Sequence, residues 1–131
     1  DYLNERVKFR EEFRPFAPAV LAELYQDYFK IGQLSPHMLI ACQATEKAKE
    51  EIPATVHVDD SCRVQTVTSD SNPRFYALLE AFYERSGCPV LLNTSFNVKG
   101  QPIVNTPKQA IDCFLSTNID CLVVGDYFVE K

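Results

Sequence analysis

Several features that commonly reveal the class of a protein are missing from this sequence. No apolar run approaches the roughly 18 residues that a membrane-spanning helix requires, and no secretory signal is visible. There is also no internal repeat, no low-complexity segment, no Cys-x-x-Cys pair and no Gly-x-x-x-x-Gly-Lys loop. These absences exclude a spanning helix, a repeat architecture and a P-loop for ATP, and they argue against a zinc site.

Basic residues are in the minority. Thirteen Lys and Arg residues stand against eighteen Asp and Glu residues, which gives a net charge of −5. Nonspecific binding to nucleic acid or to an anionic membrane requires a basic surface. We therefore expect neither a membrane nor a nucleic acid as partner, and an anionic ligand would need a local basic pocket.

The cysteines form an odd set without the spacing of a metal site. They are Cys42, Cys62, Cys88, Cys113 and Cys121. We expect reduced and mostly buried thiols in a cytoplasmic protein. Nothing beside any of the five indicates an activated nucleophile.

The composition that is present fits a soluble globular protein. With 46% apolar and 24% charged residues, 131 residues are enough for one domain with a real core. The chain opens at Asp1 without an initiator methionine. We therefore expect residues 1–131 to be a single domain that is a piece of a longer protein.

The second half of the chain alternates helix and strand patterns. One helix is expected at Pro73–Ser86, with Asn72 as its N-cap and Gly87 as its C-cap. Another is expected to start at Thr106 with a capping box. Their predicted inner faces are Phe75, Leu78, Leu79 and Phe82 in the first, and Ala110, Ile111, Phe114 and Leu115 in the second. Strands are expected at 89–92 and 121–125, so the pattern predicts an α/β fold with a mixed twisted sheet and flanking helices.

The first half predicts more strands. They are expected at 6–10, 19–22 and 38–42, with a short helix at 23–29, a hairpin from 55–58 and 63–67, and a charged, solvated connection at 45–51.

A basic pair near the start is the first candidate site. On extended backbone Lys8 and Arg10 point to one side, and Arg14 follows in the next segment. Lysine offers a point charge and arginine a rigid fork for phosphate oxygens. The alternatives are a solvated edge strand, or ion pairs with Glu11 and Glu12 that neutralise the patch.

A polar pair near the end has the same spacing. Ser95 and Asn97 follow the apolar run 90–92, at the point where strands of α/β sheets commonly present ligand contacts. The alternative is local turn chemistry, because serine and asparagine satisfy nearby backbone groups. Two cations facing a hydroxyl and an amide would make a pocket for a phosphate-bearing ligand.

A third group lies in the predicted hairpin. His57 and Asp59 share a face at strand spacing, and Arg63 lies across the turn. The histidine could donate to a carbonyl or phosphate oxygen, with Asp59 fixing its tautomer or binding Mg²⁺ through water. The alternative is a structural histidine, and two residues do not define a metal site.

The combination of Lys-x-Arg with Ser-x-Asn resembles the nucleotide-binding signature of YrdC-like domains. Five segments occur in order: Val7-Lys8-Phe9-Arg10-Glu11, Phe13-Arg14-Pro15-Phe16-Ala17-Pro18, His57-Val58-Asp59, Arg63-Val64-Gln65-Thr66-Val67 and Leu92-Asn93-Thr94-Ser95-Phe96-Asn97. Together they are similar to the C-terminal, YrdC-like domain of the O-carbamoyltransferases of the nodulation-protein and antibiotic-biosynthesis family. The similarity runs from about Leu3 to Lys131.

This resemblance implies a two-part enzyme. The C-terminal domain would form carbamoyl adenylate from ATP and carbamoyl phosphate, releasing pyrophosphate, and an N-terminal actin-like domain would transfer the carbamoyl group. The implied catalytic residues are Lys8, Arg10, Arg14, His57 and Asp59, and the implied nucleotide contacts are Lys8, Arg10, Arg63, Ser95 and Asn97. ATP with Mg²⁺ is the implied cofactor, and the parent chain's transferase domain is the implied partner.

Two departures from the family pattern qualify this interpretation. The Gly- and Arg-bearing segment that precedes this point in the family is missing, together with the transferase domain, so this piece alone is not expected to carbamoylate an acceptor. Asp60 stands where the family usually has a small turn residue, often glycine. The alternatives are a non-catalytic nucleotide-binding or regulatory module, and an RNA-directed YrdC relative, which the acidic balance opposes.

Overall fold

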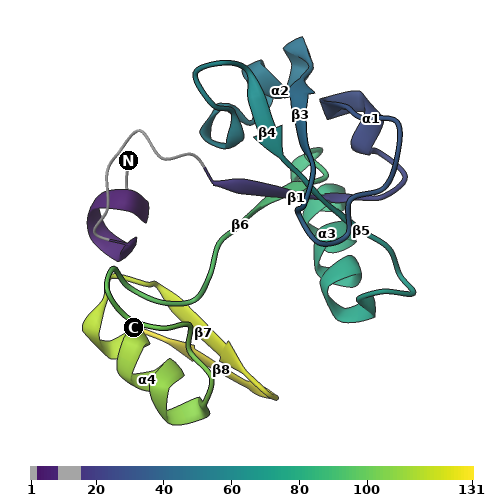
Figure 1. The fold of residues 1–131 in the computed structure, drawn as a ribbon. Coiled ribbons are helices and arrows are strands. Elements are labelled where there is room, and N and C mark those ends of the chain that lie inside the picture. The colour runs from purple at the N-terminus through teal and green to yellow at the C-terminus, as the bar shows by residue number, and fades with distance from the viewer. Residues whose placement is uncertain (1–2, 9–15) are drawn as a thin grey trace. The chain divides into compact units, whose positions relative to one another are not determined.

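Helices and strands alternate through the computed structural model, which describes residues 3–8 and 16–131 (Figure 1). This confirms the predicted α/β class with mixed sheets and flanking helices, whereas the YrdC-like topology stays a prediction. Contacts divide the chain into two compact units, Pro15–Thr94 and the combination of Asp1–Arg14 with Ser95–Lys131. The expectation that residues 1–131 form a single domain stays a prediction. Within the described residues, no helix has the length and apolarity needed to cross a bilayer.

The unit Pro15–Thr94 is built around β1 (Ala17–Leu21), which is buried on both faces. It pairs in parallel with β5 (Gln65–Val67) and antiparallel with β6 (Val90–Asn93). Ala19 and Leu21 pack on one side with residues of α3, while Val20 packs on the other side with Val90. A strand covered on both faces reads as a continuous apolar run, which is why this strand was predictable.

A second, antiparallel sheet lies in the same unit. Its order is β2 (Phe29–Lys30), β3 (Ala41–Ala44) and β4 (Ser61–Arg63). Short helices accompany it, namely α1 (Tyr25–Tyr28), α2 (Glu46–Glu51) and the 3₁₀-helix Pro53–Thr55. Residues of both sheets and of α2 share one apolar cluster: Val20, Tyr28, Phe29, Cys42, Ala44, Ala48, Cys62, Val64 and Val90.

Helix α3 (Pro73–Ser86) begins and ends where the sequence predicts. The Asn72 side chain accepts from the Phe75 backbone N–H at 3.3 Å. Gly87 adopts φ 74° and donates its N–H to the Tyr83 carbonyl at 2.8 Å. The predicted inner face is only partly right, because Leu79 is fully buried while Leu78 remains 56% exposed.

The second unit places α4 (Pro107–Ser116) on a hairpin of β7 (Cys121–Val124) and β8 (Tyr127–Glu130). The predicted capping box is present, with Gln109 N–H donating to Thr106 Oγ1 at 3.2 Å and Thr106 N–H donating to Gln109 Oε1 at 3.2 Å. Three residues of α4 are buried, namely Ala110, Cys113 and Phe114, and Ala110 and Phe114 pack against Leu122 of β7. The predicted inward positions of Ile111 and Leu115 are wrong, since both side chains are largely exposed.

Three expectations for the first half are wrong. Leu3–Lys8 forms a π-helix instead of the start of a strand. The hairpin does not form, because β4 pairs with β3 while β5 pairs in parallel with β1. The stretch expected as a solvated connection is helix α2, which is capped by Thr45 and buries Ala48 against the core.

Candidate functional site

Lys8 lies at the centre of a polar cluster in the unit that contains Ser95–Lys131. Its ammonium nitrogen lies 2.5 Å from the Ser95 carbonyl, 2.9 Å from the Asn97 carbonyl and 2.8 Å from Asn97 Oδ1. A weaker contact of 3.4 Å reaches Ser95 Oγ. The side chain is only 6% exposed. A lysine ammonium has three N–H donors, so oxygens of the protein itself engage it fully in this structure.

A tight turn over Ser95–Asn97 shapes this cluster, since Asn97 N–H donates to the Ser95 carbonyl at 3.1 Å. Phe96 packs against the core formed by α4 and β7. Its backbone carbonyl accepts from Val104 N–H at 2.9 Å. Ser95 Oγ donates to Asn97 Oδ1 at 2.7 Å. Asn97 Nδ2 in turn donates to the Gln101 carbonyl at 2.9 Å, so the local turn chemistry is present as well.

The electrostatics of the cluster suit an anion. Ser95 and Asn97 offer Lys8 four oxygens of neutral groups, so these contacts orient the ammonium without adding a negative charge. Ser95 is exposed and Asn97 is partly buried. A fixed positive charge beside a hydroxyl and an amide can stabilise negative charge that develops on a phosphoryl group.

The hairpin residues lie in the other unit, Pro15–Thr94. His57 is exposed on a turn. Asp59 Oδ1 accepts from Ser61 N–H at 3.0 Å, and hydrogen bonds from Ser61 hold the pKa of the Asp59 carboxyl below its usual value. Arg63 is exposed at the end of β4. The structure thus brings Lys8, Ser95 and Asn97 together, whereas Arg10 and Arg14 lie outside the described residues.

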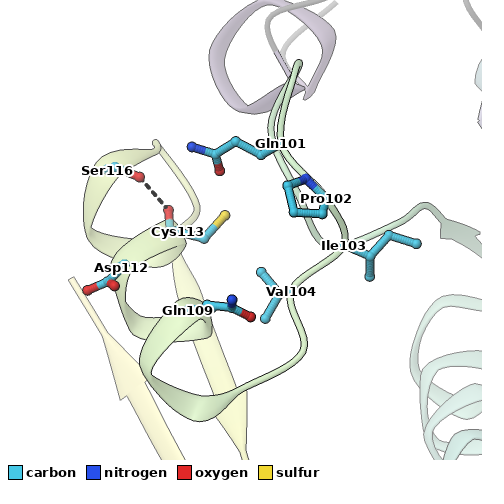
Figure 2. A pocket seen from close by; sticks show the side chains of 8 residues that line it. All are labelled: Gln101, Pro102, Ile103, Val104, Gln109, Asp112, Cys113 and Ser116. Carbon is cyan, nitrogen blue, oxygen red and sulfur yellow. Dashed lines mark hydrogen bonds between the residues drawn. The ribbon is translucent and has the colours of Figure 1, made fainter.

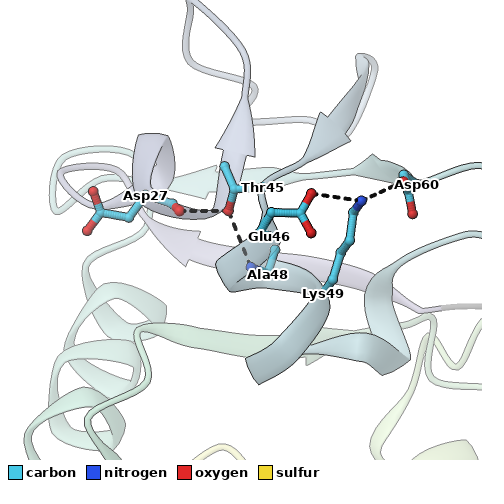
Figure 3. Close-up of polar contacts among 6 residues, drawn as sticks. All are labelled: Asp27, Thr45, Glu46, Ala48, Lys49 and Asp60. Atoms are coloured by element: carbon cyan, nitrogen blue, oxygen red, sulfur yellow. Dashed lines mark hydrogen bonds and ion pairs between the residues drawn. The ribbon is translucent and has the colours of Figure 1, made fainter.

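Asp60 is accommodated by a partner that the sequence did not reveal. It adopts φ 63°, a left-handed conformation that glycine and aspartate tolerate better than most residues. Its carboxylate Oδ2 lies 2.6 Å from Lys49 Nζ, which also contacts Glu46 Oε1 at 3.1 Å (Figure 3). The negative charge of Asp60 is therefore paired within this unit. Lys49 was missed because its helix was interpreted as a solvated connection.

Metal-ligating side chains do not gather in the described part of the chain. No three His, Cys, Asp or Glu residues there are placed to hold a metal ion.

Comparison with known proteins places the whole chain in one family. The family model described as Carbamoyltransferase C-terminus matches residues 1–131. An uncharacterized protein of Synechocystis sp. is 43% identical, with the match covering 98% of this chain and 24% of that protein. The nodulation proteins NolO of Bradyrhizobium diazoefficiens and NolNO of Sinorhizobium fredii are each 40% identical over 100% of this chain, which covers 24% and 20% of them. The chain therefore spans about a quarter or less of the length of these relatives.

Proposed function

The chain belongs to the family of carbamoyltransferase C-terminal domains, and we propose that it forms carbamoyl adenylate for an N-terminal, actin-like domain of the same polypeptide to transfer. ATP and carbamoyl phosphate are the substrates in this proposal. The observation that supports it most is the cluster of Lys8 with Ser95 and Asn97, which joins the two ends of the nucleotide-binding signature. The cluster places the positive charge of Lys8 next to the hydroxyl of Ser95 and the amide of Asn97.

The reaction must balance in atoms. Water first splits carbamoyl phosphate into carbamate and inorganic phosphate. A carbamate oxygen then attacks the α-phosphorus of ATP, the bond to the β-phosphate oxygen breaks, and pyrophosphate leaves. Such phosphoryl chemistry depends on positioning and charge stabilisation more than on covalent catalysis.

The roles of the chain's residues follow from this chemistry. Lys8 would stabilise charge on the transferring phosphorus group, and Ser95 and Asn97 would position phosphate oxygens. The Lys8 ammonium donates hydrogen bonds to oxygens of the protein, so phosphate oxygens would have to replace some of these acceptors. Arg10, Arg14 and Arg63 are proposed as further cations.

No cysteine nucleophile is needed in this proposal. Burial raises the pKa of the Cys42 and Cys113 thiols, and it raises the pKa of Cys62 to about 12. These thiols therefore hold little reactive thiolate at neutral pH.

The remaining assignments concern His57, Asp59 and magnesium. His57 and Asp59 are proposed as lower-ranking contacts to substrate oxygens. Mg²⁺ would arrive bound to the phosphates of ATP, which commonly supply several of its oxygen ligands. The proposal assigns no reaction step to the metal.

Product analysis with the full-length parent tests this function. With ATP and carbamoyl phosphate together, we expect pyrophosphate and carbamoyl adenylate in equal amounts, and neither product when carbamoyl phosphate is omitted. Formation of ADP in place of pyrophosphate and carbamoyl adenylate would contradict adenylate formation.

A non-catalytic binding module is the second candidate. The engaged ammonium of Lys8 favours it, because that side chain already has a structural role. Binding of ATP to the parent without any conversion in the presence of carbamoyl phosphate would select this alternative.

A further inference from the structure

A cavity of about 390 Å³ lies in the same unit as the Lys8 cluster (Figure 2). Its walls come from α4 and from the segment that precedes it. The lining residues are Gln101, Pro102, Ile103, Val104, Gln109, Asp112, Cys113 and Ser116. Nothing in the nucleotide-binding signature of the sequence points to this cavity.

The cavity adjoins the Lys8 cluster through two residues. The Gln101 carbonyl accepts from Asn97 Nδ2 at 2.9 Å, so the cavity wall begins where the cluster ends. Cys113 lies on the opposite wall. Burial raises the pKa of its thiol, and the positive charge of Lys8 opposes that rise. The cavity therefore begins beside the residues that are proposed to hold the phosphates.

Most polar side chains that line the cavity already form a hydrogen bond or an ion pair within the protein. Gln109 accepts two backbone hydrogen bonds in the capping box, and Asp112 binds Lys108 at 2.6 Å. Ser116 donates to the Cys113 carbonyl at 3.2 Å. Among the described residues, in contrast, the side-chain amide of Gln101 makes no hydrogen bond. Figure 2 shows this amide extending from the loop toward Cys113 and Ser116 on α4.

A free glutamine amide presents a donor and an acceptor side by side. This pattern matches the amino group and the ring nitrogen on the edge of adenine, which glutamine reads through two hydrogen bonds. Guanine offers two acceptors at the equivalent positions, so one of those bonds would be lost. Pro102 and Val104 supply apolar wall surface for a flat ring.

We propose that this cavity binds the adenine ring of the nucleotide and that Gln101 selects adenine over guanine. The inference rests on the proposed function, because it assumes that the Lys8 cluster holds the phosphates of the same nucleotide. It adds a base-recognising residue outside the Lys-x-Arg and Ser-x-Asn motifs.

Equilibrium binding to the full-length parent tests this proposal with three ligands, namely ATP, GTP and inorganic triphosphate. We expect ATP to bind more tightly than GTP. Gln101→Leu should weaken ATP binding about tenfold, reduce the preference for ATP over GTP, and leave triphosphate binding unchanged. Gln33→Leu is the matched control, since Gln33 is exposed in the other unit and should affect none of the three.

The outcomes separate this inference from the function on which it rests. Unchanged ATP affinity and nucleotide preference in Gln101→Leu would overturn base recognition while the phosphate site stands. Loss of triphosphate binding in the same variant would show a general disturbance of the site and would also overturn it. Failure of the unaltered parent to bind either ATP or triphosphate would overturn the proposed function itself.

Discussion

Replacing Lys8 with methionine is expected to lower the free energy of unfolding of the 131-residue chain by about 3 kcal/mol. Methionine keeps much of the apolar stem but removes the ammonium, which leaves the carbonyls of Ser95 and Asn97 without their charged donor. The side chain is only 6% exposed, so water does not readily replace the lost contacts. Urea-induced unfolding, followed by circular dichroism, measures the change.

Lys108 provides the matched control for this substitution. It lies in the same unit, but its side chain is 84% exposed and pairs with Asp112 on the surface of α4. Surface pairs of this kind contribute about 0.5 kcal/mol or less. If Lys8→Met proved as mild as Lys108→Met, the central role of the Lys8 ammonium in this cluster would be refuted.

Replacing Leu79 with alanine is expected to cost about 3 kcal/mol of stability. Leu79 is fully buried, and it packs with Ala19, Leu21 and Val67 where α3 meets the sheet of β1 and β5. Removing three carbons there leaves a cavity that the surrounding strands cannot fill completely. The same unfolding measurement detects the loss.

The neighbouring Leu78 supplies an internal comparison on the same helix. It is 56% exposed, so Leu78→Ala should change stability by no more than about 0.5 kcal/mol. Equal effects of the two substitutions would show that the packing side of α3 is assigned incorrectly.

These two leucines also illustrate what sequence periodicity can decide. Asn72, Pro73 and Gly87 define the ends of α3 through local backbone chemistry, which is why both ends were predictable. The buried side depends on which strand lies opposite, and that is a tertiary property. An apolar pattern at i, i+3, i+4 and i+7 therefore overestimated the width of the buried stripe.

The first half was harder to predict because its strands are very short. Cys62 and Val64 are both buried with the same core, yet β4 and β5 belong to different sheets. Local alternation could not show that the chain changes partners between them. The hairpin of β7 and β8 was missed in part, although the Gly125-Asp126 pair between two apolar runs is a recognisable turn signal.

In the candidate site, too, the local motif was predictable from the sequence, whereas the contacts between distant segments were not. The spacing of Ser95 and Asn97 predicted that their side chains lie together, and the structure joins them by a hydrogen bond. Sequence alone did not show that Lys8 lies in a π-helix, or that Gln101 continues the cluster into a cavity. The position of Lys8 depends on contacts with a segment about ninety residues away. The cavity depends on how α4 packs against the segment that precedes it.

Carbamoyl-phosphate-dependent exchange of labelled pyrophosphate into ATP tests the central claim most directly. The full-length parent should be compared with Asn97→Ala, because Asn97 links Lys8, Ser95 and Gln101, and with Asn105→Ala as a control at an exposed position in the same unit. We predict exchange in the parent and the control and a loss on the order of 100-fold in Asn97→Ala. Absence of exchange in the parent would contradict adenylate formation. Full exchange in Asn97→Ala would show that the reaction does not depend on the cluster of Lys8, Ser95 and Asn97.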